Sequence, residues 1–173
     1  GNGHMGVTAE NIASKWHISR EEQDEYAVES HRRASMARRE GLFKKQILPI
    51  EVKTRKGIVK FEQDEHIRDD ASLENLASLE PIFKKGGTVT PGSASGINDG
   101  AAALVLMEAS TARQKAVTPL ARLVGYAHSA VEPSEMGIGP VPAVQNVLKK
   151  TGLTLADIDI IEIAIKIEID PRA

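Results

Sequence analysis

The sequence predicts an α/β fold, and three observations point to that class. An unbroken apolar run, typical of a strand that is covered on both faces, occupies residues 101–107. A second candidate strand, residues 120–131, precedes a glycine-punctuated loop and a helix over residues 140–150. A third candidate strand follows over residues 158–169. Strand, helix and strand in this order are the beginning of a βαβ unit.

Helix signals dominate the start of the chain. Thr8 is a candidate N-cap for a short helix over residues 9–15, with Glu10 in its first turn. The sequence Ser19-Arg-Glu-Glu is a capping-box pattern, which predicts that the longest helix of the chain begins here. Acidic residues come first in this helix and arginines last, as the helix dipole favours, and Gly41 stands where a C-terminal stop is expected.

Two short strands and a further helix are expected next. Residues 47–52 alternate around a proline like an edge strand, and Gly57 marks a turn before a second strand over residues 58–61. Ser72 is a candidate cap for a helix over residues 73–79. None of these segments has enough contiguous apolar residues to build a sizeable core of its own.

The segment that joins the two halves of the chain, residues 88–107, combines a small-residue loop with the apolar run. The loop contains Gly92, Ser93, Ala94, Ser95 and Gly96. With so little side chain at the mouth of a buried strand, a ligand can lie against the backbone and bind hydroxyl and N–H groups. The plain alternative is a tight turn that only feeds a core strand.

The second half begins with a short helix near residues 110–115. The helix over residues 140–150 starts with prolines, whose missing N–H groups cost nothing in a first turn, and Gly152 stops it. Thr154 or Asp157 begins a brief turn before the last candidate strand.

Composition narrows the possible functions. The chain has 173 residues, 41% hydrophobic and 27% charged, with a net charge of −2 that suggests no nucleic-acid partner. No apolar run is long enough to span a membrane and no signal-peptide pattern opens the sequence, so we expect a cytoplasmic protein without a membrane partner. There is no cysteine, which excludes disulfides, thiolate metal sites and a cysteine nucleophile supplied by this chain. The histidines have no metal-ligand spacing, so no metal site is expected.

Four sequence blocks carry a family resemblance. They are His4-Met-Gly-Val-Thr-Ala-Glu-Asn11, Ile18-Ser-Arg-Glu-Glu-Gln-Asp24, residues 89–107 and Met136-Gly-Ile-Gly-Pro-Val-Pro-Ala143. In this order, and over roughly residues 3–163, they closely resemble the thiolases, a family of acyl-CoA C-acyltransferases.

The resemblance implies a partial thiolase-like fold. Thiolases have two similar βαβ halves and a loop domain that covers coenzyme A (CoA). Residues 1–87 resemble the loop domain, residues 88–107 the last strand segment of the N-terminal half, and residues 108–173 the start of the C-terminal half. Residues 164–173 are an atypical tail. The resemblance also implies a homo-oligomer in the parent enzyme.

The same resemblance implies which chemistry is missing. Thiolases condense two acetyl-CoA molecules, or cleave a 3-ketoacyl-CoA, through a cysteine acyl-enzyme, a base and oxyanion donors. This chain has no cysteine and no Gly-His-Pro motif, and Ala164 stands where the family has an asparagine that holds a water. We therefore expect no catalytic residue and no turnover by this chain alone. No cofactor is implied, since the CoA thioester is the substrate.

Residue by residue, the resemblance implies a CoA-binding surface. Ser95 would bond the pantetheine arm, Gly92 would let it approach, and Arg68 would lie near the adenine and phosphates. The residues alone leave two plainer interpretations open. Arg68 could be an ordinary surface ion pair with the neighbouring aspartates, and the glycine could serve only the turn.

Further residues correspond to positions around the acyl and pantetheine pocket. They are His4, Met5, Phe83 and Met136. Methionines suit an adaptable apolar slot. The alternatives are a core role for Phe83 and Met136, and no role for His4.

Three interpretations of the whole chain follow. It is a thiolase fragment that keeps part of the CoA-binding surface, a non-catalytic thiolase-like module for CoA binding or assembly, or one part of a split enzyme. In each case acyl-CoA or CoA is the expected ligand. Because few elements are available to cover the apolar strands, we expect exposed edges to drive association.

Overall fold

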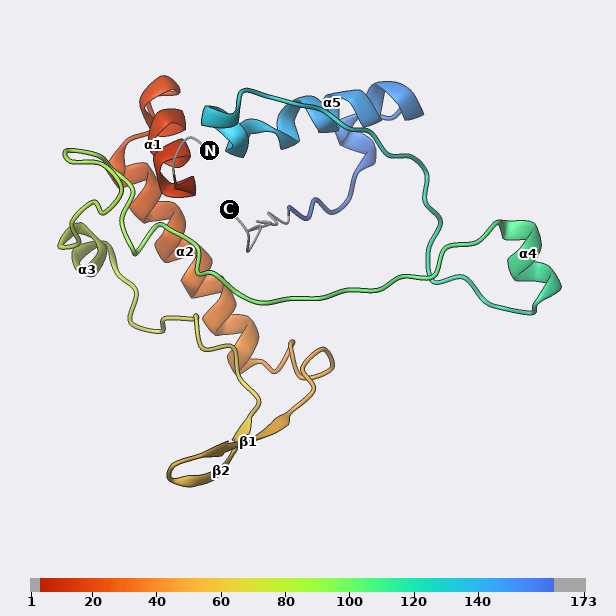
Figure 1. Ribbon diagram of the computed structural model, residues 1–173, viewed down its shortest axis with the longest axis horizontal. Coiled ribbons are helices and arrows are strands. Elements are labelled where there is room, and N and C mark those ends of the chain that lie inside the picture. Colours follow the sequence, from red (N-terminus) through yellow and green to blue (C-terminus); the bar gives the residue numbers. More distant parts are fainter. Residues whose placement is uncertain (1–3, 164–173) are drawn as a thin grey trace, which may run out of the picture. The chain divides into compact units, whose positions relative to one another are not determined.

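The computed structural model describes residues 4–163. These form two compact units, unit 1 up to Asn98 and unit 2 from Asp99. Unit 1 contains the helices α1, α2 and α3 and the hairpin β1–β2 (Figure 1). Unit 2 contains the helices α4 and α5 and the short 3₁₀ helices η1 and η2. None of the described helices is both long and apolar enough to cross a membrane.

Helix α1, Met5–Lys15, begins earlier than the sequence predicted. His4 is its N-cap, since Nδ1 of His4 accepts a hydrogen bond from the Gly6 N–H at 3.1 Å. Thr8, the expected cap, lies inside the helix, where its hydroxyl donates to the Met5 carbonyl at 2.7 Å. The early start moves Glu10 from the first turn to the middle of the helix, where it is buried.

Helix α2, Arg20–Arg39, has the predicted capping box. The Glu22 N–H donates to the Ser19 hydroxyl at 3.1 Å, and the Ser19 N–H donates to the Glu22 carboxylate at 2.7 Å. Gly41 follows with a φ of 71°, the left-handed conformation that a glycine adopts without strain. The predicted boundaries of the longest helix are confirmed.

The predicted hairpin is also present. Strands β1, Ile50–Thr54, and β2, Gly57–Phe61, pair antiparallel with Val52 opposite Val59. β1 begins after Pro49, later than expected, because a proline has no N–H to give to the ladder. Every residue of both strands is exposed, and Figure 1 shows the hairpin projecting from the rest of unit 1.

Helices α3, α4 and α5 occur where they were predicted, although α3 ends two residues early, and η1 lies in the segment predicted as a loop. Helix α3, Leu73–Ala77, is capped by the Ser72 hydroxyl, which accepts from the Asn75 N–H at 3.2 Å. In unit 2, α4 spans Ala109–Gln114 and η1 spans Pro133–Ile138. Helix α5, Pro140–Thr151, ends at Gly152 with a φ of 72°, and η2, Leu155–Asp157, follows.

The three longer strands that the sequence predicted are not formed in the described residues. Residues 101–107, 120–131 and 158–163 have no strand assignment, and Leu104 is 87% exposed. A strand needs a neighbour that accepts and donates its ladder hydrogen bonds. Within residues 4–163 only β1 and β2 supply such pairing, so an apolar pattern alone does not make these segments strands. The remainder of the last candidate strand and the atypical tail lie outside the described residues.

The interior of unit 1 is small and unusually polar. Its buried apolar residues are Ala13, Ala27, Leu76 and Val89, whereas its buried polar residues are Thr8, Glu10, Asp24, Ser35 and Thr90. Buried polar groups stabilise a fold only when their hydrogen bonds are made. The hydrogen bonds of these residues therefore determine how the loop at residues 88–95 is held.

Candidate functional site

The loop at residues 88–95 is built around Thr90, which is fully buried. Its carbonyl accepts from the N–H groups of Ser93 and Ala94 at 3.2 and 2.9 Å. Its hydroxyl accepts from the Gly92 N–H at 3.2 Å, and its own N–H donates to the Ser93 hydroxyl at 3.1 Å. This turn leaves Ser95, the next residue, exposed at the rim.

A buried carboxylate fixes the entrance to this loop. Glu10 of α1, only 3% exposed, accepts from the Thr88 N–H at 2.9 and 3.0 Å and from the Val89 N–H at 2.8 Å. Gly87 lies so close that an added Cβ would come within 2.3 Å of the carboxylate. From α2, the Gln23 amide donates to the Thr88 hydroxyl at 2.9 Å. Both helices therefore hold the same short stretch of backbone.

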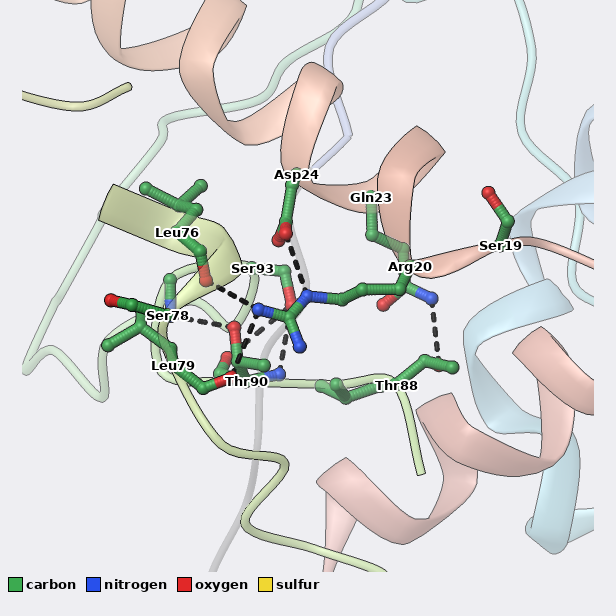
Figure 2. A network of polar contacts seen from close by, with 12 residues as sticks. Ser19, Arg20, Gln23, Asp24, Leu76, Ser78, Leu79, Thr88, Thr90 and Ser93 are labelled. Carbon is green, nitrogen blue, oxygen red and sulfur yellow. Dashed lines mark hydrogen bonds and ion pairs between the residues drawn. The ribbon is translucent and has the colours of Figure 1, made fainter. Parts of the chain in front are cut away.

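An ion pair fixes the surface on which Gly92 sits. Figure 2 shows the Arg20 guanidinium between the Asp24 carboxylate, at 2.7 Å, and the carbonyl groups at the end of α3. Nη2 of Arg20 donates to the carbonyls of Leu76 and Leu79. An added Cβ on Gly92 would lie 2.9 Å from the Leu79 side chain and 3.0 Å from that of Leu76. A larger residue at position 92 would require these leucine side chains to shift.

Two of the predicted pocket residues are in contact. The rings of His4 and Phe83 stack with their centroids 4.9 Å apart and their planes inclined by 20°. Gly6 makes room for this arrangement, since an added Cβ would come within 2.2 Å of the Phe83 ring. Met5 is adjacent in sequence and half-buried. The His4 side chain therefore has a structural role as a helix cap and as a stacking partner.

The Arg68 side chain is exposed, and its backbone is attached to α2. The Arg68 N–H donates to Nδ1 of His31 at 3.2 Å. Its neighbour Asp69 pairs with Arg38 and, at 3.9 Å, with Arg39. Among residues 4–163 no ion pair of the Arg68 guanidinium is found, so the simple pairing with its neighbouring aspartates is not observed.

The segment that carries Arg68 lies against the segment that carries Ser95. An added Cβ on Gly96 would come within 2.4 Å of the His66 ring. With the Asn98 amide oriented to satisfy its neighbours, its oxygen also accepts from Nε2 of His66 at 3.3 Å. Two of the predicted CoA contacts are thus held on adjoining loops of unit 1.

Met136 is the one predicted site residue that belongs to unit 2. It lies in η1 and is half-buried. Its carbonyl accepts from the Gly139 N–H at 3.0 Å, which shapes the turn into α5.

The described residues contain no cluster of histidine and carboxylate side chains that could hold a metal ion. Titratable groups near the loop serve structural contacts: Glu10 holds backbone N–H groups, and Arg20 holds backbone carbonyls. The arrangement offers the Ser95 hydroxyl and the Arg68 guanidinium for binding, and the chain has no cysteine.

Comparison with models of known protein families identifies the family of this chain. The family model "Thiolase, N-terminal domain" matches residues 1–110, and "Thiolase, C-terminal domain" matches residues 117–165. The chain belongs to the thiolase family. The sequence resemblance is thereby confirmed, together with the α/β class as a partial thiolase fold.

Among curated thiolases, Beta-ketothiolase BktB from Cupriavidus necator is 55% identical over 160 residues, which are 92% of this chain and 41% of that protein. The chain thus spans about two fifths of the length of the relatives it matches. The acetyl-CoA acetyltransferase of Bacillus anthracis superposes with a TM-score of 0.81 at 50% identity, over 90% of this chain and 39% of that chain.

Human mitochondrial 3-ketoacyl-CoA thiolase, solved in complex with CoA, superposes with a TM-score of 0.79 at 48% identity. That match covers 90% of this chain and 38% of the human chain.

Sequence reasoning missed the two side chains that hold the thiolase loop. The sequence predicts Glu10 as an acidic residue in the first turn of a helix, and Arg20 as an ordinary residue within a capping-box pattern. Both lie on helices, and their partners are backbone groups far along the chain, which leave no side-chain pattern to recognise. The only sequence feature that could have indicated these roles is that Glu10 and Arg20 each lie within a block that resembles the thiolases.

Proposed function

We propose that this chain is the CoA-covering part of an acyl-CoA C-acyltransferase and that it binds CoA or acyl-CoA without turning it over. The full reaction would join two acetyl-CoA units or cleave a 3-ketoacyl-CoA. That reaction needs a thiolate to carry the acyl group, and this chain has no cysteine. A protein or segment that supplies the thiolate would complete the enzyme.

The observation that carries the proposal is the arrangement of loops in unit 1. Ser95 lies exposed at the rim of a small-residue turn, and the adjoining loop carries the exposed Arg68, for which no ion pair is found among residues 4–163. An exposed hydroxyl suits the amide groups of pantetheine, and a guanidinium suits phosphate. A thiolase 48% identical to this chain has been solved with CoA bound, which supports the same ligand here.

In this proposal Ser95 bonds the pantetheine arm, Gly92 admits it, and Arg68 lies near the adenine and phosphates. His4, Met5, Phe83 and Met136 contribute to the acyl and pantetheine pocket. The stacked pair of His4 and Phe83 supports this assignment, because two of these residues already share one surface.

The domain assignment is part of the proposal. Residues 1–87 act as the loop domain, residues 88–107 as the last strand segment of the N-terminal half, and residues 108–173 as the opening of the C-terminal half. The boundary between the two compact units, Asn98 and Asp99, falls within residues 88–107.

Calorimetric titration with CoA tests the binding claim. We expect saturable binding, weakened at least fivefold in Arg68→Ala because a charge-assisted phosphate contact is lost. Arg55→Ala, a change of the same charge on the exposed hairpin turn, should bind like the unchanged protein. No heat at millimolar CoA, or equal weakening by both variants, would refute the proposal.

A second candidate function, an assembly partner within a split enzyme, is favoured by the uncovered apolar segment at residues 101–107. Leu104, Val105 and Leu106 are all highly exposed. Contiguous apolar surface of this kind marks an interaction site. Co-purification of the chain with a cysteine-bearing thiolase half, and activity only in the mixture, would support this function.

A further inference from the structure

Arg20 connects α2 to the proposed pantetheine loop through an unbroken series of contacts. Its Nε donates to the Asp24 carboxylate at 2.7 Å, on the same helix. Its Nη2 donates to the carbonyls of Leu76 and Leu79, at the end of α3. One guanidinium thus links two helices that are far apart in sequence (Figure 2).

The side chains of Leu76 and Leu79, whose carbonyls Arg20 holds, form the surface against which the loop packs. A Cβ added to Gly92 would lie 2.9 Å from the Leu79 side chain and 3.0 Å from that of Leu76, so both leucines pack closely against the glycine. Leu76 is itself 7% exposed, so it has little freedom to move aside. A shift of the end of α3 would therefore be transmitted directly to Gly92 and to the turn that ends at Ser95.

The ion pair is nearly removed from solvent. The side chain of Asp24 is 5% exposed and that of Arg20 is 21% exposed. Removing one partner of such a pair leaves an uncompensated charge, and a replacement with other geometry loses the fixed directions of the guanidinium. One oxygen of Asp24, Oδ1, has no hydrogen-bond partner among the described residues, so Arg20 is the principal contact of this carboxylate.

We propose that Arg20, oriented by Asp24, is a positioning residue. It fixes the position and orientation of the Gly92–Ser95 loop, which would bind the pantetheine arm of CoA. This inference rests on the proposed CoA-binding function. Arg20 touches no ligand in this account. It acts indirectly: it holds the carbonyls of Leu76 and Leu79, and the side chains of these leucines support Gly92.

Lysine is the informative replacement at this position. It keeps the positive charge beside Asp24, but its single nitrogen cannot hold a carboxylate and two carbonyls in the planar directions that Arg20 uses. The expected result is a loop that remains folded but is displaced. Arg33→Lys on the exposed side of the same helix is the matched control, since Arg33 pairs with a neighbouring glutamate, Glu29, and with no other carboxylate within residues 4–163.

The test measures dissociation constants for the two ends of CoA separately by ligand-detected NMR. The probes are pantetheine, which would meet the loop, and adenosine 3′,5′-bisphosphate, which would meet Arg68. We expect Arg20→Lys to weaken pantetheine binding about tenfold and to leave nucleotide binding within twofold. Asp24→Asn should show the same pattern with a smaller effect, and Arg33→Lys should change neither.

The possible outcomes distinguish failure of the positioning role of Arg20 from failure of the proposed CoA binding. If the unchanged protein binds pantetheine and Arg20→Lys binds it equally well, the positioning role is refuted while the proposed function stands. Parallel weakening of both probes, together with a loss of helical circular dichroism, would show a purely structural role and also refute it. If the unchanged protein binds neither probe, the proposed function fails and the inference fails with it.

Discussion

The carboxylate of Glu10 accepts hydrogen bonds from the Thr88 N–H at 2.9 and 3.0 Å, although 78 positions separate the two residues. The same carboxylate accepts from the Val89 N–H at 2.8 Å. A side chain of α1 thus connects the beginning of unit 1 to its end, because it accepts hydrogen bonds from backbone N–H groups that would otherwise lack partners. The proposed ligand loop begins at this contact.

Replacing Glu10 should therefore destabilise unit 1. In Glu10→Gln an amide NH₂ replaces one carboxylate oxygen, so the hydrogen bond from the Thr88 N–H to that oxygen is lost and two donors face each other. We expect a loss of about 1–3 kcal/mol in the free energy of unfolding, measured by urea denaturation. Glu25→Gln, the same change at an exposed position of α2, should stay within about 0.5 kcal/mol. Equal stability of the two variants would contradict this role of Glu10.

Gly6→Ala should disturb the stacked rings of His4 and Phe83. A Cβ at Gly6 would meet the Phe83 ring at 2.2 Å, so the ring must move. Alanine would otherwise favour the helix by about 0.5–1 kcal/mol, but overpacking typically costs about 1–3 kcal/mol. We expect a net loss of thermal stability and of the nuclear Overhauser contacts between the rings.

The control for that substitution is Gly100→Ala. No atom lies within 4 Å of the Cβ that this change would add, and φ at Gly100 is outside the left-handed region. If Gly6→Ala melts at the same temperature as Gly100→Ala and keeps the ring contacts, the close packing described for Gly6 is wrong.

Glu29 should stay ionised in acid. Hydrogen bonds from the side chains of Arg32 and Arg33 lower the pKa of this carboxyl from 4.5 to about 2. Because the pKa falls on folding, the contribution of Glu29 to stability is present above its ordinary pKa and is lost as the pH falls towards 2. The side chain is exposed, so the measurable effect is the titration itself and not a large change in stability.

Carboxyl NMR checks this prediction. At pH 3.5 the Glu29 carboxyl should still be ionised. Changing both arginines to glutamine should return the pKa of Glu29 towards 4.5. A midpoint near 4.5 in the unchanged protein would show that the two ion pairs do not form in solution.

The uncovered apolar segment should make the chain self-associate. Leu104 and Leu106 are exposed in the segment that the sequence predicted as a buried strand. We expect light scattering to give a mass that rises with concentration, and Leu104→Lys with Leu106→Lys to lower it. A monomer of constant mass at all concentrations would contradict the interpretation of this segment as an uncovered strand.

The local elements of this fold could be predicted from sequence because their signals lie within a few residues of one another. The capping box at Ser19 and Glu22, the glycine after α5 and the cap of α3 at Ser72 all occur where expected. The start of α1 was wrong because a histidine supplies the cap, and histidine is not among the usual capping residues.

The parts that depend on distant partners could not be predicted in the same way. An apolar run such as residues 101–107 specifies a strand only when neighbours complete the ladder, and the described residues provide none. Likewise Glu10 and Arg20 bind backbone groups that have no sequence signature. The candidate ligand contacts came from the family resemblance, and their roles remain predictions.

The central claim, that this thiolase chain binds the CoA thioester but does not react with it, is tested most directly by one calorimetric experiment. Acetoacetyl-CoA is injected into the chain in the presence of equimolar CoA, the substrates of thiolytic cleavage. We expect heats that saturate and return to baseline after each injection. Steady heat that scales with protein and yields acetyl-CoA would contradict the absence of turnover, and no heat at millimolar ligand would contradict binding.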